Sequence, residues 1–128
     1  MSLTNLEIFN FINSCKEMVM KNLPLKLAYC LRYNMNILTP YYQACEEERI
    51  KIIEKYTIKD ENGNPVVTGG ELTFADDSIY MELNELLSIE NEIEVRKIDI
   101  DIVERTEEEQ FDNITTEELN NIMFMIEG

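Results

Sequence analysis

One long helical seam in the first half of the chain limits most strongly what this sequence can fold into. From residue 24 to residue 56, residues recur at alternating steps of four and three, the spacing of one face of an α-helix. The ten positions are Pro24, Ala28, Leu31, Met35, Leu38, Tyr42, Cys45, Arg49, Ile52 and Tyr56. Arg49 is the one charged member. The pattern is a heptad seam, which predicts a long helix that packs along another helix.

Pro40 lies inside this seam. Proline removes one helical hydrogen bond and its ring crowds the preceding turn, so the helix must kink or break there. The seam keeps its phase on both sides of Pro40, which favours a kink. The alternative is two helices, the second capped by Thr39. The sequence leaves both open.

A shorter helix is predicted before the seam. Thr4 and Glu7 have the spacing of a capping box, and the helix is expected to end at Asn22. At 1.5 Å per residue the two helices would be about 25 Å and about 50 Å long. Folded as a hairpin, the first helix can therefore cover only about half of the second. The seam from Tyr42 to Tyr56 needs a further partner, either a later helix of this chain or a second copy.

The second half of the sequence mixes short elements. Residues 60–65 predict a turn, residues 66–74 a small β-hairpin, and Asp76 or Asp77 the cap of a third helix. From Glu92 to Val103 apolar and acidic residues alternate, with one slip of phase at Arg96-Lys97. That alternation predicts a strand with a bulge, whose outer face is a row of carboxylates.

The end of the chain predicts a final helix, opened by the capping box of Thr115 and Glu118. The whole is expected to be one domain over residues 1–128, a mostly helical α+β fold. It would combine a long N-terminal helical hairpin with a small antiparallel β element and a C-terminal helix. Residues 1–3 and 127–128 resemble expression-vector remnants and are left out of the functional interpretation.

Charge is spread unevenly along the chain. The net charge is −15. Residues 1–59 hold eight Lys/Arg and six Asp/Glu, whereas residues 60–128 hold three and twenty. Phosphate backbones and anionic membranes are bound by Lys and Arg clusters. We therefore expect neither direct nucleic-acid binding nor membrane binding, and expect a protein partner instead.

Familiar catalytic arrangements are missing from the sequence. The chain has no histidine, which removes Ser-His and Cys-His pairs and His-containing zinc sites. Cys15, Cys30 and Cys45 have no CxxC spacing and fall on apolar helical stripes, so buried free thiols are expected. No glycine-rich phosphate loop, signal peptide or membrane-length apolar run occurs. The chain is expected to be a cytoplasmic protein of a bacterial host cell, without enzymatic activity or a cofactor.

A weak calcium candidate overlaps the predicted turn. Asp60, Asn62, Asn64 and Glu71 occupy positions 1, 3, 5 and 12 of an EF-hand loop. Position 6 requires glycine for the sharp turn, but this chain has Pro65 there. The alternative interpretation is a polar hairpin that binds no metal.

A second candidate surface is acidic. Its members are Glu92, Glu94, Asp99, Asp101, Glu104, Glu107, Glu108 and Glu109. A row of carboxylates can imitate a phosphate backbone and occupy the basic groove of an enzyme that handles DNA. The alternative function is therefore an acidic DNA mimic that inhibits a host nucleic-acid-binding enzyme.

Several stretches of the chain, in the same order, resemble small uncharacterised proteins encoded by phages and prophages of low-GC Gram-positive bacteria. These stretches are LPLKLAYCLRYNMNIL (23–38), EEERIKIIEKY (46–56), KDENGNPVV (59–67), NELLSIENEIEVRKI (84–98) and ITTEELNNIMFMI (114–126). The resemblance implies an accessory or assembly role in the phage cycle, and it assigns no role to single residues.

The first functional expectation combines this resemblance with the long seam. We expect a non-enzymatic phage or prophage accessory or assembly protein that acts through protein–protein contacts, as a homo-oligomer or with another protein. The expected contact residues are Met35, Leu38, Tyr42, Arg49, Ile52 and Tyr56.

Overall fold

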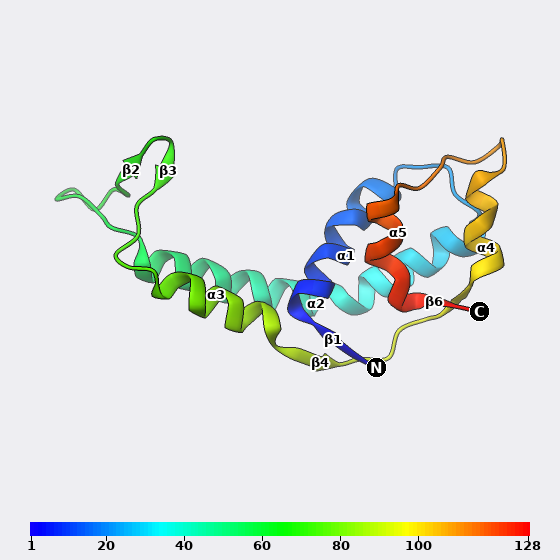
Figure 1. Cartoon of the computed structure of the whole chain (residues 1–128), viewed down its shortest axis with the longest axis horizontal. Helices are drawn as coiled ribbons and strands as arrows, with labels where there is room; N and C mark the ends of the chain where they lie inside the picture. The colour runs from blue at the N-terminus through cyan, green and yellow to red at the C-terminus, as the bar shows by residue number, and fades with distance from the viewer.

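The computed structural model describes all 128 residues and has five α-helices and three two-stranded β pairs (Figure 1). This mostly helical α+β fold confirms the predicted class. The helices are α1 (Asn5–Met18), α2 (Leu25–Tyr56), α3 (Ser78–Ser88), α4 (Ile100–Glu104) and α5 (Thr116–Ile122). The strands are β1 (Ser2–Thr4), β2 (Val67–Thr68), β3 (Glu71–Leu72), β4 (Glu90–Glu92), β5 (Ile98–Asp99) and β6 (Ile126–Glu127).

The first helix begins as its capping box predicts. The Glu7 backbone N–H donates to the Thr4 hydroxyl over 3.1 Å, and the Thr4 backbone N–H donates to the Glu7 carboxylate over 3.0 Å. α1 ends at Met18, however, four residues before the expected end at Asn22. The reason is that residues 19–24 turn back to start α2.

The long helix passes through Pro40 without a break, so the alternative of two helices is wrong. Pro40 is exposed, and the carbonyl group that it leaves without a partner can therefore bond to water. The neighbouring Thr39 hydroxyl donates to the Met35 carbonyl over 2.6 Å, within the same helix. No helix in the structure combines the length and apolar character needed to cross a membrane.

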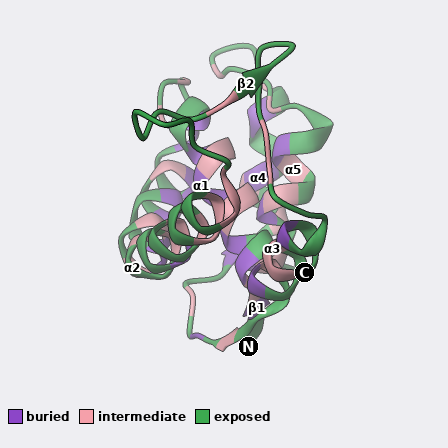
Figure 2. Ribbon diagram, turned by 90° about the vertical axis from the view of Figure 1, so that its left-hand side faces the viewer, coloured by how far each residue is buried: buried purple, intermediate pink, exposed green.

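The main core lies between α1, the first half of α2, and the C-terminal elements α4 and α5 (Figures 1 and 2). Residues 1–3, whose sequence resembles a vector remnant, belong to this body. Leu3 is 2% exposed, β1 pairs antiparallel with β4, and the Ile93 N–H donates to the Met1 carbonyl over 2.8 Å. At the other end of the chain, β6 pairs in parallel with β5.

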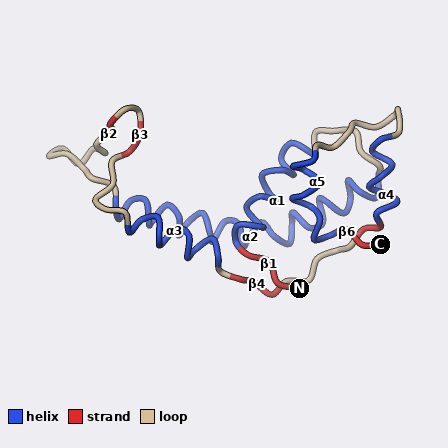
Figure 3. The backbone as a smooth tube through the Cα atoms, in the orientation of Figure 1, coloured by secondary structure: helices blue, strands red, loops and turns tan.

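The second half of α2 extends beyond α1, and α3 packs along it in the opposite direction (Figures 1 and 3). We call residues 41–56 of α2, together with α3, the arm. A later helix of the same chain thus supplies the partner that the seam required. The β2–β3 hairpin lies at the tip of the arm and turns at Gly69 and Gly70. Their φ angles of 62° and 85° favour glycine.

The expected strand from Glu92 to Val103 is wrong. Within this range only Glu92, the last residue of β4, and Ile98–Asp99, which form β5, lie in strands, and the chain then enters α4. Asp99 is the N-cap of α4 and accepts a hydrogen bond from the Asp101 N–H over 3.4 Å. Ile100 and Val103 stand three residues apart, which suits a helical turn as well as a strand. The period of a run this short therefore does not decide between them.

Candidate functional site

Three of the six predicted contact residues lie in or against the core of the same chain. Leu38 is fully buried in the core, so its side chain is not open to a partner in the single chain. Met35 and Tyr42 pack against the same core, and the Tyr42 ring stacks on Phe9 with 5.8 Å between the ring centroids. The part of the seam next to the body is thus covered by α1.

The other three predicted contact residues, Arg49, Ile52 and Tyr56, lie on the arm and are half-buried. Arg49 donates to both carboxylate oxygens of Glu46, over 2.8 and 2.9 Å. This hydrogen bonding holds the pKa of Glu46 below its usual value. The charged groups of Arg49 and Glu46 are therefore paired with each other.

One face of the arm is apolar. On the opposite face, Lys55 of α2 and Glu82 of α3 form an ion pair with 3.0 Å between Nζ and Oε1. Residues two positions apart point to nearly opposite sides of an α-helix, so Ile53 and Tyr80 lie across the arm from that ion pair. We call the set on this side the apolar arm face: Ile50, Ile53, Tyr80, Leu83 and Leu87.

The apolar arm face continues the side of α2 that α1 covers in the body. Tyr42, Glu46 and Ile50 follow one another along it at steps of four. Beyond the end of α1 it is open, with Ile50 48% and Tyr80 56% exposed. Within the whole arm only Cys45, Ile79 and Leu86 are buried.

The predicted acidic row is not one row. Glu92 lies on β4 and pairs with the N-terminal amine over 3.2 Å, whereas Glu108 pairs with Arg105 over 3.1 Å. The other members fall on separate segments: Glu94 before β5, Asp99 on β5, Asp101 and Glu104 on α4, and Glu107 and Glu109 after it. The DNA-mimic hypothesis therefore loses the straight strand face that motivated it.

The residues of the calcium candidate form a polar turn. One Asp60 carboxylate oxygen accepts the backbone N–H groups of Asn62 and Asn64, over 2.9 and 3.0 Å. Glu71 lies on β3 in the hairpin beyond the turn. No three acidic or thiol side chains come together to hold a metal ion. The Asp60 carboxylate therefore stabilises the turn.

All three cysteines are free and buried. Burial, with a smaller contribution from the nearby Glu118 carboxylate, raises the pKa of Cys15 to about 12. Burial also raises the pKa of Cys30 and of Cys45. The three thiols are therefore protonated near neutral pH, and a protonated thiol is a poor nucleophile.

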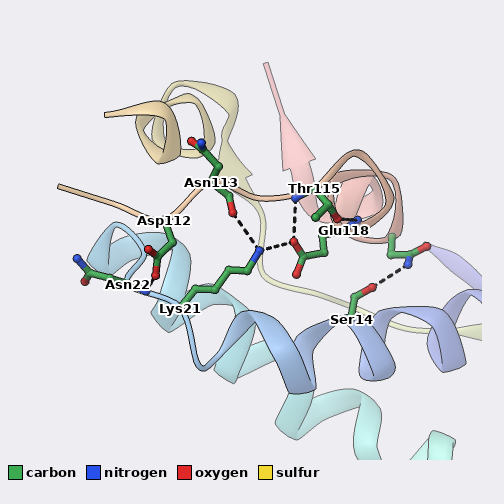
Figure 4. A network of polar contacts seen from close by, with 8 residues as sticks. Ser14, Lys21, Asn22, Asp112, Asn113, Thr115 and Glu118 are labelled. Carbon is green, nitrogen blue, oxygen red and sulfur yellow. Dashed lines mark hydrogen bonds and ion pairs between the residues drawn. The ribbon is translucent and has the colours of Figure 1, made fainter. Parts of the chain in front are cut away.

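A network of polar contacts ties the turn after α1 to the start of α5 (Figure 4). The Lys21 ammonium donates to Glu118 Oε1 over 2.7 Å and to the Asn113 carbonyl over 2.9 Å. The same carboxylate oxygen accepts the Thr115 N–H over 2.8 Å and completes the capping box of α5. Burial opposes ionisation of Glu118, but these hydrogen bonds outweigh it and lower its pKa.

A cavity of 610 Å³ lies at the end of α2 opposite the arm. Its walls are the first turns of α2, the segment before α4, and α4 itself. The lining residues are Leu25, Lys26, Tyr29, Cys30, Arg96, Lys97, Ile98, Asp99 and Ile102. We call it the cationic cavity, because three of its four charged residues are basic.

The position of Arg96 is fixed by a buried amide. Asn34, which is fully buried, accepts the Arg96 backbone N–H over 2.8 Å and donates to the Arg96 carbonyl over 2.9 Å. The Cys30 thiol donates to the same carbonyl over 3.3 Å. The Arg96 side chain then lies over Tyr29 and Tyr33, with its guanidinium carbon 5.1 and 5.4 Å from their ring centroids.

Sequence reasoning missed this cavity, although signals for it exist. Asn34 stands four residues after Cys30 and four before Leu38, so it is a polar residue in the middle of an apolar stripe. Arg96 and Lys97 are adjacent cations within a strongly acidic half. The slip of phase at these two residues predicts only a bulge in a strand.

No protein-family model, curated protein or solved structure matches this chain. The resemblance to phage-encoded proteins thus gains no second line of support.

Proposed function

We propose that this chain is a non-enzymatic protein that acts by binding protein, and that it forms a homo-oligomer through its arm. The observation that carries the proposal is the apolar arm face, which is open over the half of α2 that α1 does not reach. The buried, protonated thiols and the turn- and cap-forming carboxylates of Asp60, Asp99 and Glu118 support a role without catalysis.

The geometry of the arm favours a second copy as the occupant of this face. A pair of helices can bury only the seam between them, and here that seam supplies three buried residues, Cys45, Ile79 and Leu86. Two such pairs packed face to face make a four-helix bundle, in which each pair covers the other. A two-fold axis through the bundle would present the same apolar arm face from each copy.

A phage or prophage accessory or assembly role stays a proposal that rests on the sequence resemblance alone. Self-association does not depend on that setting and can be measured on the purified chain.

We expect the wild-type chain to be a dimer by light scattering during gel filtration at high micromolar concentration. Ile50→Glu and Tyr80→Glu each place a charge in the apolar arm face, and desolvating that charge in a bundle is costly. We expect both variants to be monomers. Because both side chains are about half exposed in the single chain, the fold of each variant should persist by circular dichroism.

The matched control is Met81→Glu. Met81 is adjacent to Tyr80 in α3 and 74% exposed, and its place on the helix turns it away from the apolar arm face. This variant should stay a dimer. A monomeric wild-type chain would contradict self-association through the arm. So would a Met81→Glu variant that loses the dimer as completely as Ile50→Glu and Tyr80→Glu.

A further inference from the structure

The cationic cavity brings together three of the six Lys and Arg residues that have no carboxylate partner. Among eleven Lys and Arg residues, those with a carboxylate partner are Lys21, Arg49, Lys51, Lys55 and Arg105. Lys26, Arg96 and Lys97 have none, and all three line the cavity. The chain has twenty-six Asp and Glu residues, yet none of them pairs with these three cations. The three positive charges are therefore free to bind an anion from solution.

The groups in the cavity are held in place without using up their positive charge. The buried Asn34 clamps the backbone of Arg96, whose guanidinium group donates no hydrogen bond within the chain and keeps its five N–H donors free. The Lys97 ammonium donates to the Phe124 carbonyl, which anchors it while two of its donors remain. No carboxylate neutralises either group.

The walls of the cavity also offer apolar surface. Tyr29 lines the cavity. Tyr33 lies one turn further along α2, outside the lining, with 6.4 Å between the two ring centroids. Leu25, 82% exposed, and the half-buried Ile102 line the cavity beside Tyr29. A volume of 610 Å³ falls in the range of about 300–1,000 Å³ that is typical of small-molecule pockets.

From these contacts we propose that the cationic cavity binds a small organic anion, a carboxylate or phosphate ester that carries a ring. The anionic group would lie among Lys26, Arg96 and Lys97, and the ring against Leu25, Tyr29 and Ile102. This inference concerns a different surface from the arm and does not depend on self-association.

Charge favours a small ligand over an acidic macromolecule. Interactions between exposed charges are largely screened beyond about 8–10 Å, so a small anion in the cavity responds mainly to the three cations that line it. A long polyanion would have to cross Asp99 at the cavity and the neighbouring Asp101, in the half of the chain that holds twenty acidic residues.

The test uses 8-anilinonaphthalene-1-sulfonate, a fluorescent ring compound with one negative charge, titrated into the full chain. We expect Lys26→Gln and Arg96→Gln each to weaken its binding by about fivefold, the equivalent of losing one partly exposed charge contact. Arg32→Gln is the matched control. Arg32 is an exposed cation of α2 without a carboxylate partner, and it lies outside the cavity.

Competition separates the possible ligands. Phenyl phosphate and benzoate should displace the probe, whereas benzyl alcohol, which has the ring without the charge, should not. Equal binding by Arg96→Gln and Arg32→Gln would overturn the proposal, and so would stronger displacement by poly-glutamate than by phenyl phosphate. Arg96→Gln should fold, because Asn34 holds only backbone atoms at that position. The exposed Lys26 gives an independent variant.

Discussion

Replacing Lys21 by Met should destabilise the chain by about 3 kcal/mol near neutral pH, the largest effect that we expect from a single surface-facing residue. Breaking a buried ion pair by removing one partner costs about 3–5 kcal/mol, because the other charge stays buried without compensation. The Glu118 side chain is 6% exposed, and its Oε2 already has no hydrogen-bond partner. Lys21 is 25% exposed, so water can reach the site in part, and we expect the lower end of that range.

The pH dependence of this effect has a definite sign. The folded-state pKa of Glu118 is lowered, so its ion pair stabilises the fold above the usual glutamate pKa and is lost as the pH falls through the folded value. Without Lys21, burial acts unopposed and protonation relieves the cost. The stability difference between wild type and Lys21→Met should therefore be largest at neutral pH and shrink below about pH 4.

Chemical denaturation at several pH values measures both quantities. Lys51→Met is the matched control, since Lys51 pairs with Glu48 over 3.6 Å at an exposed site and such pairs contribute at most about 1 kcal/mol. Adding Glu118→Gln to Lys21→Met should restore part of the lost stability, because it removes the unpaired charge. Equal losses in Lys21→Met and Lys51→Met would mean that the network of Figure 4 does not stabilise the fold.

Local rules predicted the starts of α1 and α5 well. The capping boxes of Thr4 with Glu7 and of Thr115 with Glu118 both form as read from the sequence. The helical seam also predicted that α2 continues through Pro40, because the phase of its apolar residues is the same on both sides. α2 is a single helix of 32 residues. In these segments the local pattern and the tertiary packing favour the same structure.

Prediction failed where several structures fit one short pattern. The alternation at Ile98–Ile102 suits a strand, yet five residues with Asp99 as a cap also suit one helical turn. The buried position of Leu3 depends on pairing with β4, about ninety residues away, and no local signal reports such a contact. For the same reason the sequence did not bring Lys26 next to Arg96.

The cationic cavity depends most on Asn34, a polar residue that interrupts the apolar stripe of α2. Asn34 is fully buried and makes two hydrogen bonds to the backbone of Arg96, over 2.8 and 2.9 Å. Leucine has a similar branched shape but no hydrogen-bonding group. Asn34→Leu would leave the Arg96 N–H without a partner, while the carbonyl keeps the weaker Cys30 contact.

We expect Asn34→Leu to lose about 2 kcal/mol of unfolding free energy, since a buried polar group without a partner costs about 1–3 kcal/mol. It should also abolish binding of the fluorescent probe, because the segment that carries Arg96 and Lys97 is no longer held against α2. The Arg96 amide should exchange with solvent quickly, whereas the amides of α2 stay protected. Asn36→Leu, on the exposed side of the same helix, is the control and should change none of these readouts. If Asn34→Leu keeps a protected Arg96 amide and full probe binding, the buried amide is a packing residue and the cavity is held by other contacts.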